Sequence, residues 1–385
     1  MRLERVWRLR EGSYVVELHE RWHNGGERTG AGASLSPADA RCPPPPPSGF
    51  SLTNPELYSF VGAAWWSPEA RFEKLAFDGF ARSPIASGRA VAGGWIAMLQ
   101  HYFVAAWIPP PGQAWQFETA IPEAGRYLIR AVGPGLELAP GASIETQARL
   151  FVGPKLQNLL PKVAEGLDLT VDYGIFTIFA KPLFWLLDLI QRAVGNWGLA
   201  IVLLTVLIKL AFYKLSEAQY RSMAKMRRLQ PRLEALRERY GDDRAKLNQA
   251  LLELYRKEKI NPLGGCLPIL VQIPVFIALY WVLLESVELR QAPFVGWIRD
   301  LSARDPYFVL PVLNGLTMWL TQKLSPSPGM DPLQQRLMQA LPLVFAVLFA
   351  FFPAGLVLYW TVNGLLGLAQ QWYILRRVEG AGRNA

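Results

Sequence analysis

Apolar positions follow two different patterns on either side of residue 171. Before it, short apolar and aromatic runs at residues 14–18, 95–99 and 102–107 are separated by glycine and proline. Short apolar runs bounded by turn-forming residues are typical of β-strands joined by turns. We therefore predict an all-β domain over residues 1–170.

The segment 24–49 is the exception within this region. It contains Gly25, Gly26, several alanines and serines, and five consecutive prolines at positions 43–47. Proline lacks a backbone donor and fixes φ, so it cannot continue a helix or a central strand. We predict a long surface loop for residues 24–49.

After residue 171 the apolar runs become long enough for membrane-spanning helices. They cover residues 197–213, 263–284, 337–352 and 356–374, with a shorter run at residues 307–320 that contains Pro311 and Asn314. The sequence therefore predicts a core of five membrane helices over residues 196–378, with the short run as the fifth span.

Loop charges orient these spans. The segment 214–259 carries 13 Lys and Arg residues against 7 Asp and Glu residues, whereas 285–305 carries 3 against 4. Basic loops stay on the cytoplasmic side, so we place residues 214–259 and the tail 379–385 in the cytoplasm and residues 285–305 outside. The β domain then lies outside the membrane, and because residues 1–10 contain no apolar stretch, its export requires a segment that precedes them.

Residues 171–195 mix bulky apolar residues with Lys181, Asp188 and Arg192. Their purely apolar core is short, which favours an amphipathic helix in the outer membrane interface over a sixth span.

The basic segment 216–259 is predicted to form two antiparallel helices. Gly241 suits the end of the first helix, and Asp242 or Asp243 suits the N-cap of the second. Apolar residues recur every three or four positions, at Met223, Met226, Leu229, Leu233 and Leu236. These stripes can pack on each other or form a docking surface for nascent chains or lipid headgroups.

Lys209 is a cation among aliphatic residues of the first predicted span. Its ammonium can snorkel to the cytoplasmic surface, or it can line a wet cavity that attracts an acidic or polar guest. Other polar and aromatic residues at membrane depth could line the same cavity or simply tie helices together. They are Thr205, Gln272, Tyr359, Trp360 and Asn363.

Composition offers little support for catalysis or cofactors. The three histidines lie in the β domain, the two cysteines lie in segments of different character, and no phosphate-binding glycine loop is recognisable. We expect no cofactor, no metal and no enzymatic activity. The net charge of +9 is compatible with nucleic acid, anionic lipid or the basic loops of a membrane protein, and composition does not choose among them. We expect no sequence-specific nucleic-acid binding.

Several segments resemble the bacterial YidC/Oxa/Alb family of membrane insertases. They read NWG (196–198), NPLGGC (261–266), SVELRQAP (286–293) and FPAGLVLYW (352–360), with GWIAMLQ (94–100) and LDLTVDY (167–173) in the β domain. The resemblance covers residues 50–378, while residues before Phe50 match poorly. It implies a periplasmic β-supersandwich followed by a helical membrane domain of the bacterial inner membrane.

The resemblance also implies a function. Members insert and fold membrane proteins through a hydrophilic groove open to cytoplasm and lipid, alone or with the Sec translocon, and without ATP hydrolysis. Expected partners are nascent membrane proteins, the Sec translocon, membrane lipids and, weakly, the ribosome. The groove cation is usually arginine, and Lys209 stands in its place, which keeps the charge but loses the bidentate fork. A small-anion channel or secondary transporter is the alternative.

Overall fold

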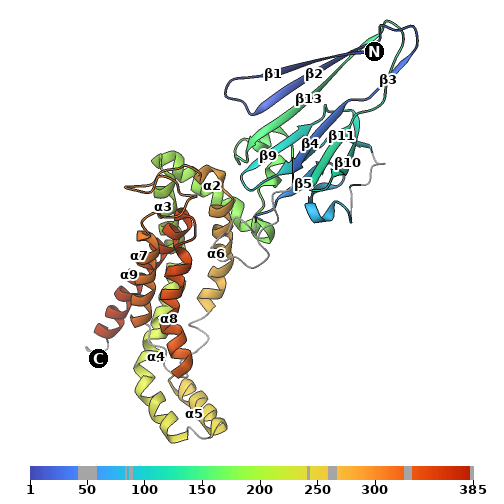
Figure 1. Cartoon of the computed structure of the whole chain (residues 1–385). Helices are drawn as coiled ribbons and strands as arrows, with labels where there is room; N and C mark the ends of the chain where they lie inside the picture. Colours follow the sequence, from blue (N-terminus) through green and yellow to red (C-terminus); the bar gives the residue numbers. More distant parts are fainter. Residues whose placement is uncertain are drawn as a thin grey trace. The chain divides into compact units, whose positions relative to one another are not determined.

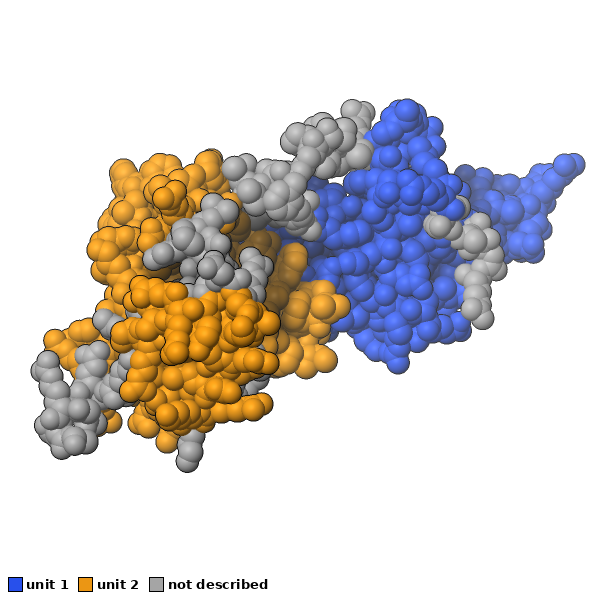
Figure 2. Space-filling view, turned by 90° about the horizontal axis from the view of Figure 1, so that it is seen from below, with its two compact units in different colours: residues 1–51, 55–172, 285–288 blue, residues 52–54, 173–284, 289–385 orange. Residues whose placement is uncertain are grey.

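The computed structural model describes residues 1–41, 59–82, 85, 90–240, 243–258, 267–324 and 332–381. Contacts divide the chain into two units, coloured separately in Figure 2. The first, here the β unit, comprises Met1–Ser51, Pro55–Asp172 and Glu285–Glu288. The second, here the helical unit, holds the remaining residues from position 173 onward and a short stretch at 52–54. A β-rich N-terminal region followed by a helical one is therefore confirmed.

Two antiparallel sheets and a short ribbon form the β unit (Figure 1). The larger sheet has the order β1 (Arg2–Leu9), β2 (Val15–His23), β13 (Ser143–Pro154), β9 (Phe103–Ile108), β8 (Trp95–Leu99), β5 (Gly62–Ser67), β6 (Arg71–Ala76). The smaller sheet has the order β4 (Leu35–Arg41), β11 (Arg126–Val132), β10 (Ala114–Glu123), β7 (Ala90–Ala92). The ribbon pairs β12 (Leu136–Leu138) with β3 (Gly30–Gly32). The strands predicted near residues 14–18, 95–99 and 102–107 are confirmed as β2, β8 and β9.

Alternating side chains bury both faces of the larger sheet at β5 and β8. Ile96 and Met98 of β8 belong to a core shared with Phe117 and Ile129 of the smaller sheet, which makes a sandwich. On its opposite face, Trp95 donates its indole N–H to the carbonyl of Glu165, 2.9 Å away. Glu165 lies between two short helices, α1 (Leu160–Val163) and η3 (Leu167–Thr170).

The loop predicted for residues 24–49 is partly wrong. The segment contains β3 and β4, and β4 pairs along its whole length with β11. Proline is compatible with this strand because β4 is the edge of its sheet, so Pro37 does not need to donate toward a second neighbour. The five prolines at positions 43–47 lie outside the described residues.

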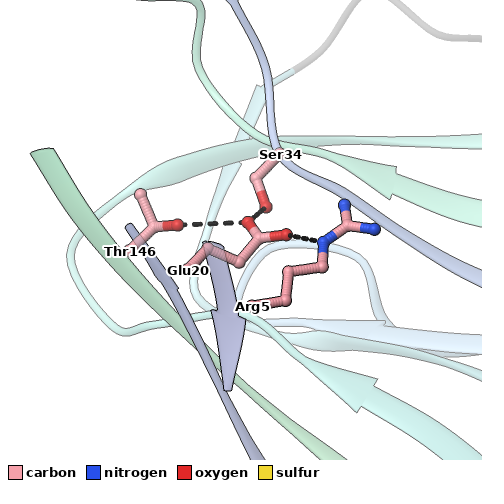
Figure 3. Close-up of polar contacts among 4 residues, drawn as sticks. All are labelled: Arg5, Glu20, Ser34 and Thr146. Atoms are coloured by element: carbon pink, nitrogen blue, oxygen red, sulfur yellow. Dashed lines mark hydrogen bonds and ion pairs between the residues drawn. The ribbon is translucent and has the colours of Figure 1, made fainter. Parts of the chain in front are cut away.

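A buried carboxylate ties the first strands together. Glu20 of β2 is 2% exposed, and its Oε1 accepts a bond from Arg5 Nε of β1 at 2.8 Å (Figure 3). Its Oε2 accepts bonds from the hydroxyls of Ser34 and of Thr146 in β13. Three donors from three segments therefore compensate the desolvation of this charge.

A second group of buried charges surrounds Glu285. Its Oε1 accepts a bond from Ser59 Oγ at 2.8 Å and lies 3.6 Å from His101 Nε2. Burial raises the pKa of Glu285 to about 7, and burial lowers the pKa of Lys155 to about 8. The two residues attract each other electrostatically, which limits both shifts.

Long helices make up the helical unit. They are α2 (Thr177–Val194), α3 (Trp197–Ala211), α4 (Tyr213–Tyr240), α5 (Arg244–Lys257), α6 (Leu267–Glu285), α7 (Val309–Leu324), α8 (Pro332–Phe349) and α9 (Ala354–Ala381). The single turns η4 (Gly174–Phe176) and η6 (Val287–Leu289) precede α2 and follow α6. Within this unit α9 packs on α3, α4 and α7.

Few of the helices are both long enough and apolar enough to cross a membrane by themselves. Among the described residues, one continuous helix, Gly174–Val194, is long and apolar enough to cross a membrane. The helices Trp197–Ala211 and Tyr213–Met226 are bent by 66° relative to each other, and they would form a second candidate span if the bent pair is taken as one. The helix that the sequence assigned to the membrane interface thus has the length and composition of a span.

The segment that the sequence assigned to the cytoplasm contains the helices α4 and α5, which contact each other. Asp243, one of the two N-cap candidates, accepts a bond from the amide of Lys246 at 3.1 Å and caps α5. Leu229 and Leu233 of the apolar stripe are buried. Gly241 and Asp242 lie outside the described residues.

Candidate functional site

The cation singled out by the sequence lies in the last turn of α3. This helix begins after Asn196, whose side-chain oxygen accepts a bond from the amide of Leu199 at 2.9 Å. Its buried face repeats at helical spacing and ends near Lys209. The buried residues are Gly198, Ala200, Ile201, Leu204, Thr205 and Ile208.

A close approach fixes the first turn of α3. The side-chain amide of Asn196 donates to the carbonyls of Pro293 and Phe294 at 3.2 and 3.1 Å. A methyl group added at Gly198 would lie 2.2 Å from the ring of Phe294, so only glycine fits there. The chain that leads into α7 is therefore held against the start of α3.

One face of α9 supplies polar groups opposite Lys209. Tyr359, Asn363, Gly367 and Gln370 are separated by four, four and three residues, which places them on the same side of the helix. The phenol of Tyr220 in α4 donates to the carbonyl of Gly367 over 3.4 Å. Gln370 Nε2 donates over 3.4 Å to the carbonyl of Tyr213, at the bend between α3 and α4.

Lys209 is half-buried beside this face. A methyl group added at Gly367 would lie 3.5 Å from Lys209 Nζ and 3.6 Å from the Tyr220 hydroxyl, so the three residues meet. Within the described part of the chain, Lys209 forms no ion pair with a carboxylate. Among the described residues, the Tyr220 hydroxyl and the backbone of Gly367 are thus polar groups beside this charge, and no carboxylate compensates it. We call Lys209, Tyr220, Gly367 and Gln370 the polar layer.

The other predicted groove residues have different surroundings. Thr205 is 1% exposed, and its hydroxyl donates to the carbonyl of Ile201 at 2.7 Å within its own helix. Trp360 stacks on Phe349 of α8 with ring centroids 4.1 Å apart, and Phe276 of α6 lies 5.7 Å from it. Tyr359 is buried, with its ring 6.1 Å from Phe276. These two aromatic residues thus join α6, α8 and α9 by ring packing.

The last two predicted groove residues, Gln272 and Asn363, lie on different helices, α6 and α9. Gln272 is half-buried on α6, one turn from Phe276, so the two share a face of that helix. Asn363 is half-buried on α9, one turn from both Tyr359 and Gly367. Asn363 is therefore the predicted residue best placed to extend the polar layer along α9.

Sequence reasoning missed Tyr220 and Gln370. Tyr220 looked like part of a cytoplasmic helix, and its contact with α9 depends on tertiary structure. Gln370 could have been found, because it continues the spacing that begins at Tyr359 and Asn363. The polar layer offers hydrogen-bond donors, acceptors and one fixed cation, which suits transient contact with a polar chain. No cluster of three His, Cys, Asp or Glu residues suited to a metal exists among the residues that the structure describes.

Comparison with known families covers nearly the whole chain. Residues 1–186 match the family model described as the YidC periplasmic domain, and residues 189–381 match the model described as 60Kd inner membrane protein. The chain belongs to the YidC family of membrane protein insertases. The match starts at residue 1, so the expectation that residues before Phe50 match poorly is wrong. The first two strands of that segment, β1 and β2, interleave charged residues with apolar ones, and this alternation indicates a strand without indicating a family.

Individual YidC proteins agree with this assignment. The chain is 55% identical over 384 residues to the "Membrane protein insertase YidC" of Alkalilimnicola ehrlichii, covering 99% of this chain and 67% of that protein. It is 52% identical over 387 residues to the protein of the same name from Thioalkalivibrio sulfidiphilus, covering 100% of this chain and 68% of that protein. The chain thus spans about two thirds of these relatives. A solved structure described as "Active YidC insertase crystal structure with the first transmembrane domain resolved" shows 20% identity and a TM-score of 0.46, over 93% of this chain and 92% of that one.

Proposed function

We propose that this chain inserts and folds membrane proteins in the bacterial inner membrane. One observation carries the proposal: in a YidC-family chain, the half-buried Lys209 lies beside the Tyr220 hydroxyl and the backbone of Gly367, without a carboxylate partner among the described residues. An uncompensated cation at membrane depth is costly, and such residues usually mark functional sites. Here the charge would draw a polar or acidic substrate segment part-way across the bilayer.

The proposed topology follows from the loop charges. Helices α3, α6, α7, α8 and α9 cross the membrane, α4 and α5 form a cytoplasmic hairpin, and the β unit is periplasmic, with residues 379–385 in the cytoplasm. We place α2 in the outer interface, because Lys181, Asp188 and Arg192 interrupt its apolar residues. The polar layer and the neighbouring Gln272 and Asn363 would line a groove open to cytoplasm and lipid.

Insertion would need no ATP hydrolysis, since contacts between the substrate and the polar groups of the groove would lower the barrier. The partners would be nascent membrane proteins and lipids, with the Sec translocon for some substrates and the ribosome held weakly by the basic helices α4 and α5. Membership in an insertase family does not favour the channel or transporter alternative.

Rescue of cells depleted of their own insertase tests this proposal. The chain, preceded by a signal anchor, is expressed, and insertion of a substrate with one or two spans and an acidic translocated tail is measured. Lys209→Arg should retain insertion, because it keeps the cation, whereas Lys209→Glu should lose most of it by repelling the acidic tail. Normal insertion by a folded, well-expressed Lys209→Glu variant would refute the role of the charge.

A further inference from the structure

The loop that joins α6 to α7, residues 290–308, is held rigidly by the helical unit. The amides of Ala354 and Gly355, at the start of α9, donate to the carbonyls of Ala303 and Leu301 at 2.7 and 2.8 Å. Asn196 holds the other part of the loop against the start of α3. The loop therefore covers the ends of two helices and is not a free connection.

Asp305 organises the end of this loop. Its carboxylate is 2% exposed and accepts bonds from Trp297 Nε1 at 2.9 Å and from the amides of Tyr307 and Leu310 at 3.1 and 2.8 Å. These bonds hold Phe308 at a φ of 57°, a left-handed conformation that is rare for a bulky side chain. Such strain persists only where the surroundings impose it, and it is common at functional positions.

The strained backbone presents aromatic rings to the exterior. Tyr307 is 69% exposed and Phe308 49%, and the ring of Trp297, 40% exposed, packs edge-on against Tyr307 with centroids 6.2 Å apart. The indole N–H of Trp297 is bound to Asp305, while much of its ring remains exposed. Arg299 and Arg304 of the same loop are also exposed.

We infer that this loop is a membrane anchor, in which Trp297, Tyr307 and Phe308 lie in the headgroup region of the outer leaflet and Arg299 and Arg304 contact the phosphates of anionic lipids. Trp and Tyr prefer this region because one end of each ring system is polar, and arginine binds phosphate oxygens through its planar fork. The surface also continues into the exposed apolar residues Val312 and Leu316 of α7, the helix that follows. The inference rests on the proposed function, since it requires α7 to cross the bilayer.

Spin labels in lipid bilayers test the anchor. Single cysteines at positions 297, 307 and 308 are labelled in nanodiscs of phosphatidylethanolamine and phosphatidylglycerol, after replacement of the two native cysteines by serine. Collision rates with oxygen and with a water-soluble nickel complex then give the depth. Leu316 serves as the reference for hydrocarbon and Glu137, exposed in the β unit, as the reference for water.

Labels at Tyr307 and Phe308 should lie between the two references, with nickel collisions several-fold fewer than at Glu137. Collisions as frequent as at Glu137 would overturn the inference, as would shielding from both reagents, which would indicate a protein partner. A label at Leu316 that collides with nickel rather than oxygen would instead refute the membrane placement of α7.

The role of the arginines is tested by changing the lipid. In phosphatidylcholine alone, the loop labels should become shallower, and the double variant Arg299→Gln and Arg304→Gln should abolish this lipid dependence. Equal depth in both lipids would remove the arginines from the proposed contact.

Discussion

The β unit and the helical unit differ in how far the charge of a buried side chain is compensated by hydrogen bonds and ion pairs. Glu20, inside the β unit, accepts bonds from Arg5, Ser34 and Thr146. Lys209, in the helical unit, has a carbonyl and a hydroxyl nearby but no carboxylate partner in the described residues. A fully compensated charge contributes to one folded arrangement, whereas an uncompensated charge keeps its attraction for something outside the protein.

This difference separates stability from activity. Substitutions around Glu20 should weaken the β unit, because they leave a desolvated carboxylate with fewer donors. Substitutions at Lys209 should change activity, because within the described part of the chain no ion pair depends on its charge. The following predictions test that contrast, beginning with the largest effect.

Lys209→Met should lower insertion of substrates with acidic tails several-fold while leaving the helical unit intact. Replacing a desolvated, unpaired cation by an apolar side chain of similar length is neutral or stabilising, by up to about 3 kcal/mol. Insertion assays and thermal unfolding in detergent measure the two effects separately. A variant that loses activity and stability together would show that Lys209 is part of the folded framework.

Arg5→Met should destabilise the β unit by about 1.5–3 kcal/mol, the usual value of a hydrogen bond to a charged group. Arg10→Met is the matched control, because Arg10 pairs with Glu17 at 2.8 Å while its own side chain is 73% exposed. Exposed pairs contribute less than about 1 kcal/mol. Hydrogen exchange of amides in β2 and β13 gives both values. Equal effects of the two substitutions would contradict the structural role assigned to Glu20.

The Glu285 group predicts a smaller, pH-dependent effect. Because the pKa of Glu285 is raised from 4.5 to about 7, the folded state binds more protons than the unfolded state between these values, and stability should fall as the pH rises through them. The pKa of Lys155 is lowered from 10.5 to about 8, so stability should rise again between pH 8 and 10.5. Each slope is less than about 1.4 kcal/mol per pH unit.

Glu285→Gln should remove the lower slope and make the upper one begin at a lower pH, because Lys155 then loses the attraction that limits its pKa shift. The measurement is hydrogen exchange in the β unit across pH, corrected for the intrinsic exchange rate. A flat profile in the unsubstituted protein would mean that water or rearrangement relieves the burial of both groups.

The sequence identified elements where the local pattern determines the structure. β8 was visible because a short apolar run lies between turn residues, and Asp243 because an N-cap needs a short polar side chain before a helix. β4 was missed because Leu35–Arg41 contains small and polar residues, and its strand conformation depends on pairing with β11. Residue type alone could not indicate a partner so distant in the chain.

The candidate site shows the same limit. Lys209 was identified because a cation among aliphatic residues is unusual wherever it occurs. Tyr220 was missed because its meeting with Gly367 depends on how α4 packs against α9. Trp360 was assigned to the groove from its depth in the sequence, but only the structure shows that its ring stacks on Phe349.

The smallest effect is expected at the N-cap of α5. The carboxylate of Asp243 accepts a bond from the amide of Lys246, and this backbone bond holds the pKa of Asp243 below its usual value. The stabilisation is therefore present above the ordinary aspartate pKa and is lost as the pH falls through the lowered one. Asp243→Ala should speed hydrogen exchange of the first-turn amides of α5 at neutral pH, whereas Asp243→Asn, which keeps an oxygen acceptor, should change it little. Insertion should be nearly unaffected by either variant, because the polar layer contains no residue of α5. A large loss of insertion in Asp243→Ala alone would show that the order of α5 matters for substrate delivery, and the contrast between stability and activity would then fail in α4 and α5.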